Sequence, residues 1–206
     1  MAHIAETRAA PPSRSTAGAL ASLSLAMLVS SLGTSIANVA LPTLSAAFAA
    51  PFPAVQWVVL AYLLAITALI VGVGRLGDLV GRRLLLIAGL ALFGAASFAA
   101  ALAPSLTLLI AARALQGLGA AVMMALTIAF VGDTVPRERT GSAMGLLGTM
   151  SAIGTALGPS LGGVLIGALG WRSIFLASGV LGAVALLAAW RFLPAAGIVR
   201  QQARGR

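Results

Sequence analysis

An arginine and a glutamine stand three positions apart inside an apolar stretch of this chain. Arg113 and Gln116 lie in the run of about Leu106–Val131, which holds no other charged residue. In a helix the two side chains share a face, and Arg113 lies roughly 10 Å from the start of the run. A guanidinium at that depth in hydrocarbon costs at least about 2.5–3.5 kcal/mol. We expect Arg113 to face inward with a partner or water; a side chain that reaches back to the headgroups is the alternative.

Groups that could titrate or bind a metal are scarce. The chain has no cysteine, no lysine and one histidine, His3. Its carboxylates lie in the N-terminal tail or in predicted loops: Glu6, Asp78, Asp133 and Glu138. We therefore expect no disulfide, metal or cofactor, and any proton-carrying acid would lie outside this chain. Serines such as Ser97 and Ser151 have no histidine or lysine base in the spans, so we do not expect an intramembrane protease or another enzyme.

The first apolar run carries a row of small polar side chains. Ser31, Thr34, Ser35 and Asn38 follow helical spacing and share one face. They either form hydrogen bonds to neighbouring helices, or Asn38 contacts a substrate, and the residues leave both interpretations open. The candidate cavity residues are Asn38, Tyr62, Arg113 and Gln116.

The composition defines the surroundings of these residues. Hydrophobic residues make up 60% of the chain, charged residues 8%, and the mean hydropathy is +1.07. A soluble domain carries roughly 25% charged residues, so this composition predicts an all-α membrane protein. About six spans of roughly 20 residues fit into 206 residues. The net charge of +9 does not indicate nucleic-acid binding, because the basic residues gather in loops and tails without interleaved aromatics.

One charged segment sets the topology. Residues 74–83 read GRLGDLVGRR and separate the uncharged runs Phe52–Val73 and Leu84–Ala112. We expect a loop at a membrane surface, on the cytoplasmic side because it is rich in arginine. Pro42 should end the first span, Ala103-Pro104-Ser105 should form a turn, and a second charged loop should cover Gly132–Thr140.

The predicted organisation is a disordered cytoplasmic leader at 1–16, a six-span bundle at 17–193 and a cytoplasmic tail at 194–206. The expected spans are about 17–41, 52–73, 84–102, 106–131, 141–169 and 173–193. Of the 13 basic residues, all except Arg113 and Arg172 fall on the side of the leader, the charged loops and the tail. We therefore expect a multi-pass protein with both termini in the cytoplasm.

The fifth span is rich in glycine. Residues 154–163 read GTALGPSLGG, in which Gly154, Gly158 and Gly162 repeat every four positions. Such a row predicts a groove in which another backbone packs closely. Pro159 removes one helix hydrogen bond and favours a kink.

Four motifs together resemble one family. Residues 74–83 resemble the loop between the second and third spans of the major facilitator superfamily, and residues 154–163 match the fifth-span signature of its drug:proton antiporters. Residues 113–120 (RALQGLGA) resemble the fourth-span motif of those antiporters, and residues 38–42 (NVALP) are similar to the first-span end in the fourteen-span branch. The resemblance covers about residues 20–193. It implies one half of a major facilitator fold, with spans one to three and four to six related as an inverted repeat.

The resemblance also implies roles for single residues. Asp78 and Arg82 match a cytoplasmic charge cluster that latches two halves in the outward-facing state together with an acid matching Asp133. Arg113 matches an arginine associated with proton coupling and the binding cavity. The implied gate residues are Gly74, Asp78, Gly81, Arg82, Arg83 and Asp133.

The resemblance implies that Gly158 and Pro159 shape the bending of the fifth span and limit leakage across the membrane. The implied packing residues are Gly154, Gly158, Pro159, Gly162 and Gly163.

The sequence departs from the family pattern in two ways. Gly33 stands where the fourteen-span branch has an aspartate, which weakens the case for proton coupling through this half. Family members have two six-span halves, whereas this chain supplies one.

We expect the N-terminal half of a multidrug-type efflux carrier of the bacterial inner membrane, a proton-coupled antiporter by resemblance, that works by alternating access. Its partners would be the lipid bilayer, a small amphipathic or apolar substrate, protons, and a missing C-terminal half, second chain or second copy. The alternative is a truncated or non-transporting six-span protein, or a half-size exporter of a small metabolite that needs a partner chain.

Overall fold

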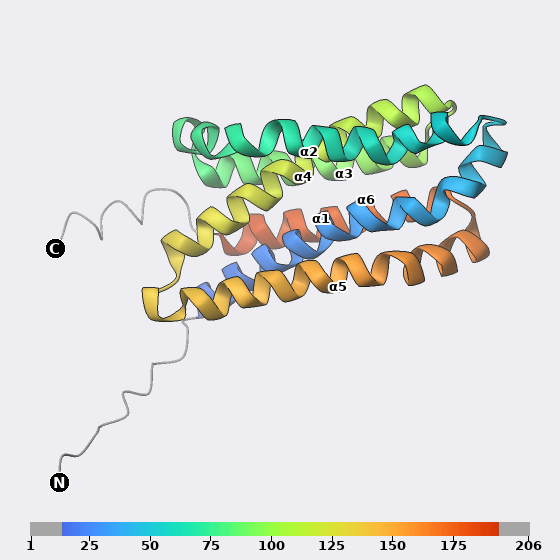
Figure 1. Ribbon diagram of the computed structural model, residues 1–206. Coiled ribbons are helices and arrows are strands. Elements are labelled where there is room, and N and C mark those ends of the chain that lie inside the picture. The colour runs from blue at the N-terminus through green and yellow to red at the C-terminus, as the bar shows by residue number, and fades with distance from the viewer. Residues whose placement is uncertain (1–13, 194–206) are drawn as a thin grey trace, which may run out of the picture.

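The computed structural model describes residues 14–193, apart from the side chains of residues 14–16, 133 and 134, and its regular elements are all α-helices (Figure 1). The helices are α1 (Arg14–Ala47), α2 (Phe52–Val80), α3 (Arg82–Ala101), α4 (Leu106–Thr134), α5 (Arg137–Leu169) and α6 (Arg172–Phe192). All six are long and apolar enough to cross a membrane. The predicted class, an all-α protein with six spans, is confirmed.

The helices pack in a pattern with internal symmetry. α5 packs mainly against α1, along the lower edge of Figure 1, and α2 packs mainly against α4. α3 and α6 pack against each other, and they also cover α4 and α1, respectively. Exchanging α1–α3 for α4–α6 converts the α1–α5 pair into α4–α2 and the α3–α4 pair into α6–α1, and it leaves the α3–α6 pair unchanged, as expected for a three-plus-three repeat.

The two charged segments are much more helical than the sequence suggested. The prediction of a loop at residues 74–83 is wrong, because α2 continues to Val80 and α3 begins at Arg82. Only Gly81 lies between them, with a φ of +100° that few other residues adopt. The predicted loop at Gly132–Thr140 is likewise reduced to Val135 and Pro136. A single residue with an unusual φ reverses the chain, so the charged side chains can stay on helical backbone.

The first helix does not end at Pro42. α1 passes through this proline and continues to Ala47. Proline costs the helix one backbone hydrogen bond. The continuation is favoured because Leu41 and Leu44, on either side of Pro42, are buried in the hydrophobic core.

The predicted turns at the other helix ends have recognisable caps. Ala103-Pro104-Ser105 separates α3 from α4, and the Ser105 Oγ accepts a hydrogen bond from the Leu108 amide at the start of α4. Gly170 ends α5 with a φ of +82°.

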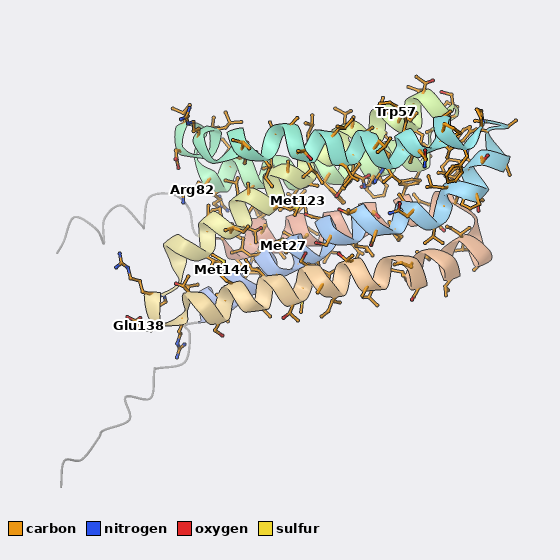
Figure 2. The ribbon with its side chains drawn as sticks, viewed as in Figure 1. Met27, Trp57, Arg82, Met123, Glu138 and Met144 are labelled. Atoms are coloured by element: carbon orange, nitrogen blue, oxygen red, sulfur yellow. The ribbon has the colours of Figure 1, made fainter. Side chains whose placement is uncertain are left out.

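The core consists of two hydrophobic clusters, one above the other along the bundle. The first includes Leu23, Leu90 and Met123 and lies toward the end where α2 meets α3. The second includes Ile36, Leu109 and Phe175 and lies toward the other end. We call these two ends of the molecule the charged end and the opposite end. Figure 2 shows Arg82 and Glu138 near the charged end and Trp57 near the opposite end.

Candidate functional site

Arg113 lies fully buried where the two hydrophobic clusters meet. Its Nε donates to the Val58 carbonyl of α2 at 2.9 Å, and its Nη2 donates to the Gly33 carbonyl of α1 at 3.1 Å. Its Nη1 donates to Gln116 Oε1 on the same helix at 2.6 Å. The guanidinium also lies 4.1 Å from the centre of the Tyr62 ring. The inward orientation expected for Arg113 is the one that the structure shows.

The network continues from Arg113 to a third helix. Gln116 Nε2 donates to Ser97 Oγ of α3 at 2.7 Å, and the Ser97 hydroxyl donates to the Phe93 carbonyl at 2.6 Å. Tyr62 donates from its hydroxyl to the Ser30 carbonyl of α1 at 2.8 Å. These bonds join α1, α2, α3 and α4. We call Tyr62, Ser97, Arg113 and Gln116 the arginine cluster.

Neutral groups compensate the charge of Arg113. The described hydrogen-bond partners of its guanidinium are two backbone carbonyls and one side-chain amide, and an aromatic face lies against it. In a low-dielectric interior, oriented oxygen atoms and a π face stabilise a cation without a carboxylate. The cluster is therefore built to hold a fixed positive charge and to position four helices.

Gly33 leaves little space for a larger residue. A Cβ added at this position would lie 3.0 Å from the Tyr62 hydroxyl and 3.3 Å from the Phe93 ring. The Gly33 carbonyl accepts a hydrogen bond from Arg113. At this position the chain thus offers Arg113 only a backbone carbonyl, and the neighbouring Tyr62 and Phe93 side chains fill the space that a side chain would need.

Asn38, the fourth candidate cavity residue, is not part of the arginine cluster. It is exposed on α1, and its amide donates back to the Thr34 and Ser35 carbonyls of its own helix. Ser31 and Ser35, which share its face in sequence, instead contact α5: Ser31 Oγ lies 2.7 Å from Ser151 Oγ, and Ser35 donates to the Gly154 carbonyl at 3.3 Å. The interhelical interpretation therefore holds for the two serines, and Asn38 stays available on the surface.

Outside the first and last two turns of each helix, the exposed polar residues that the structure describes lie on α1, α2 and α5. They are Asn38 of α1, Thr67 of α2, and Thr149, Thr155 and Ser160 of α5. The exposed positions of α3 and α6, away from their ends, carry only alanine, leucine, valine and phenylalanine in the part of the chain that the structure describes. We call the first surface the polar face and the second the α3–α6 face.

The candidate gate residues divide into two groups at the charged end. Asp78 and Arg82 form an ion pair of 2.9 Å across Gly81. Arg82 lies at the charged end in Figure 2, and its side chain is partly buried. Asp133 lies in the last turn of α4, and its side chain lies outside the described part of the structure.

Arg83 and Gly74 lie apart from that ion pair. Arg83 donates to the Trp190 and Leu193 carbonyls at the end of α6. Gly74 is exposed on α2, with open space where a Cβ would be. Their assignment to the gate stays a prediction.

The fifth-span glycines form the seam between α5 and α1. A Cβ on Gly154 would overlap the Leu28 carbonyl, a Cβ on Gly158 would overlap Ser35 Oγ, and a Cβ on Gly162 would lie 3.0 Å from Ile36. Pro159 and Gly163 are exposed on the other side of the helix.

A sequence model of the Major Facilitator Superfamily matches residues 23–206. The chain belongs to this superfamily. The fold agrees: a solved bacterial homologue of the human lysosomal transporter Spinster, in an inward-facing conformation, is similar with a TM-score of 0.78 at 16% identity, over 89% of this chain and 44% of that one. Six apolar helices in a superfamily of transporters indicate an integral membrane protein.

Curated members of the superfamily include drug exporters and a vitamin transporter. The chain is 36% identical over 170 residues to the riboflavin transporter RibZ of Clostridioides difficile, covering 82% of this chain and 37% of that protein. It is 41% identical over 152 residues to the multidrug resistance protein Stp of Mycobacterium tuberculosis, covering 73% and 28%. It is 36% identical over 172 residues to the methylenomycin A resistance protein of Bacillus subtilis, covering 83% and 37%. The chain spans about a third of the length of these relatives.

Sequence reasoning missed one member of the arginine cluster, Ser97, and the three backbone carbonyls that accept hydrogen bonds from the cluster. The carbonyls of Gly33, Val58 and Ser30 have no signal in the sequence, because every residue supplies a carbonyl. Ser97 could have been found as an isolated polar residue in the apolar α3 stretch, where a hydroxyl needs a partner.

Proposed function

We propose that this chain forms the N-terminal half of a multidrug-type efflux carrier that works by alternating access. Membership of the superfamily and the two named resistance proteins support transport of small, largely apolar compounds. The transported compound would bind between this bundle and a second one.

The polar face is the observation that carries the proposal. Threonine, serine and asparagine side chains are costly against lipid tails, yet five of them point outward from α1, α2 and α5. The hydroxyls of Thr67, Thr149 and Thr155 donate to carbonyls of their own helices, so they do not need a hydrogen-bond partner on a neighbouring helix of the bundle. A surface of this kind is expected to line a cavity or to meet a second bundle.

Asn38 is the candidate that we assign to direct contact with substrate. It is exposed on this face, and its amide is free to exchange its hydrogen bonds with the α1 carbonyls for bonds to a substrate. Tyr62, Arg113 and Gln116 lie behind it, fully buried, and we assign them the task of holding α1, α2 and α4 in place around the cavity.

Proton coupling, which the resemblance implies, needs an acid that the middle of these spans does not supply. The chain has four carboxylates, and all lie in the N-terminal tail or near the ends of helices. For a proton-coupled antiporter the titrating group would therefore belong to the second bundle. The ion pair of Asp78 and Arg82, with Asp133, would serve as the latch between the bundles.

We place the protein in the bacterial inner membrane with both termini in the cytoplasm. The arginines of the charged end support this orientation, since Arg75, Arg82, Arg83, Arg137 and Arg139 all lie there. The second bundle would come from the same polypeptide, from a second chain or from a second copy of this one.

A chimera tests the proposal. Residues 1–193 would replace the matching region of the methylenomycin A resistance protein of Bacillus subtilis in a sensitive host. The chain should confer resistance when joined to the remaining spans, and Asn38→Ala should weaken it. A chimera that reaches the membrane at the level of the intact relative yet gives no resistance to any compound in a drug panel would contradict the proposal and favour a non-transporting role.

A second candidate function is export or uptake of a small metabolite. The observation that favours it is the 36% identity to the riboflavin transporter of Clostridioides difficile. Growth of a riboflavin auxotroph that carries the corresponding chimera with that transporter separates the two candidates. Growth without drug resistance would select the metabolite carrier.

A further inference from the structure

Three of the arginines that stand in first helical turns, where helix electrostatics disfavours them, belong to α3 and α6. α3 begins with Arg82 and Arg83, and α6 begins with Arg172. The first turn of a helix exposes unpaired N–H groups and carries the positive end of the helix dipole, so a cation there destabilises its own helix. The ion pair with Asp78 offsets this unfavourable helix-dipole interaction for Arg82. The other two arginines need a different explanation.

Arg83 reaches from the start of α3 to the end of α6. Its Nη2 donates to the Trp190 carbonyl at 2.9 Å, and its Nε donates to the Leu193 carbonyl at 3.0 Å. α6 ends at Phe192 with Leu193 as its C-cap. The last carbonyls of a helix have no partner within it, and a cation near them is favourable. Arg83 therefore caps a helix other than its own.

Arg172 makes a weaker contact in the opposite direction. It reaches from the start of α6 to the turn that follows α3, where its Nη2 donates to the Ala103 carbonyl at 3.4 Å, one residue beyond the C-cap Leu102. Its guanidinium lies 4.3 Å from the centre of the Trp171 ring, which holds it in place. Trp171 is in turn buried against Phe48 and Phe175, at 5.4 and 6.1 Å between ring centres.

Between these two contacts, α3 and α6 approach each other closely. A Cβ on Gly179 of α6 would lie 3.0 Å from the Phe98 ring of α3, and a Cβ on Gly182 would lie 3.1 Å from the Phe93 ring. The helices hold equivalent positions in the three-plus-three repeat, and the two arginines obey the same symmetry, one at each end of the pair.

We propose that Arg83 and Arg172 are positioning residues that tie the two ends of the α3–α6 pair, Arg83 by capping α6 and Arg172 by holding the turn after α3, and so lock the two helices into one rigid pair. α2 and α5, by contrast, are each held mainly by one other helix. If the bundle rocks during transport, a step that rests on the proposed function, the α3–α6 pair moves as one body and any change of shape falls on α2 and α5.

Hydrogen exchange of the purified full chain tests the caps helix by helix. Arg83→Gln should speed amide exchange in the last turn of α6 by about tenfold or more, because two charge-assisted bonds are lost, and leave the last turn of α3 unchanged. Arg172→Gln should speed exchange in the turn after α3, at the Ala103 and Ser105 amides, by about threefold and spare the end of α6, since its single bond is longer and lies beyond α3. The measurement needs no transport, so its failure is distinct from failure of the proposed function.

Arg191→Gln is the matched control. It removes a charge from the last turn of α6 without touching the two capped carbonyls, so exchange there should change less than twofold. Arg83→Lys keeps the charge but loses the forked donor that bonds to two carbonyls. Its exchange rate in the last turn of α6 should therefore lie between the rates of the wild type and Arg83→Gln. Equal exchange in Arg83→Gln and Arg191→Gln would overturn the proposal. If Arg83→Gln does not fold, an Arg83→Lys variant with wild-type exchange at the end of α6 would also overturn it.

Discussion

At the scale of single residues, Arg113 shows how a charge can be kept in a membrane interior. Its side chain is fully buried, and two helix carbonyls, one amide oxygen and the Tyr62 ring surround it. A helix carbonyl that already accepts its intrahelical bond has a second lone pair to offer. The charge therefore joins three helices without a carboxylate partner, and its geometry depends on a planar, forked donor.

Replacing Arg113 tests this joint. Arg113→Ala should lower the free energy of unfolding in detergent by about 2–4 kcal/mol, because Gln116 and the two carbonyls lose their donor and a cavity opens. The free energy of unfolding of Arg113→Lys should lie between those of the wild type and Arg113→Ala, since one ammonium group cannot reach three separated acceptors.

Arg75→Ala is the control for the Arg113 variants. Arg75 is exposed on α2, and its loss should change stability by less than about 0.5 kcal/mol. If Arg113→Ala and Arg75→Ala had the same free energy of unfolding, the structural role of Arg113 would be contradicted. A stable Arg113→Ala chimera that no longer gives resistance would instead indicate direct action on the transported species.

At the scale of elements, α5 is held mainly by one neighbouring helix. It meets α1 along one seam, where Gly154, Gly158 and Gly162 let the backbones approach and Ser31 and Ser35 add polar contacts. The rest of its surface is exposed. A helix attached through one row of small residues can shift along its neighbour with few side chains in the way.

Two glycines of the same motif should respond oppositely to alanine. Gly158→Ala should cost about 1–3 kcal/mol, because its Cβ would overlap Ser35 Oγ and lie 2.7 Å from Ser35 Cβ. Gly163→Ala meets open space and should be neutral or stabilise by up to about 1 kcal/mol. Thermal unfolding in detergent measures both, and Ser35→Gly should rescue part of the Gly158→Ala loss. Equal changes in stability for Gly158→Ala and Gly163→Ala would contradict close packing of α5 against α1 at Gly158.

The corner between α2 and α3 offers a second matched pair. Gly81→Ala should cost about 1–2 kcal/mol because its φ of +100° strains any residue with a Cβ. Gly74→Ala lies in helix with open space around it and should stabilise by about 0.5–1 kcal/mol. Thermal unfolding in detergent measures both variants. If Gly81→Ala were as stable as the wild type, the backbone at Gly81 would have another conformation.

At the scale of the whole molecule, two surfaces with different chemistry divide the bundle. The α3–α6 face is apolar between its ends and suits contact with lipid, whereas the polar face on α1, α2 and α5 suits a cavity or a second bundle. The ends differ as well, because the charged end gathers most of the arginines, with Arg172 at the opposite end. Together these features define an orientation in the membrane.

The orientation can be measured directly, because the chain has no cysteine of its own. Single cysteines at Arg75 and Glu138 should react with a membrane-impermeant maleimide only after the cytoplasmic side is opened. Cysteines at Leu102 and Pro104 should react in intact cells, since these exposed residues lie at the opposite end. Labelling of positions 75 and 138 from opposite sides would rule out the six-span topology.

The number of spans, their order and the inward-facing Arg113 followed from the sequence alone. Long apolar runs, arginine-rich boundaries and one charge in a span are local patterns, and the absence of water in a bilayer allows very few structures for them. The glycine row of α5 predicted a close seam for the same reason, since spacing along one helix determines which residues share a face.

Only the tertiary structure decided what each polar side chain meets. Arg82 and Arg83 are neighbours in sequence, yet one pairs with Asp78 and the other caps α6, because successive residues of a helix point about 100° apart. Asn38 was grouped with Arg113 by type but lies outside its cluster, while Ser97 and three backbone carbonyls lie inside it or bond to it. Contacts between distant helices depend on how those helices pack and rotate, and carbonyl acceptors, which every residue carries, leave no trace in the residue types.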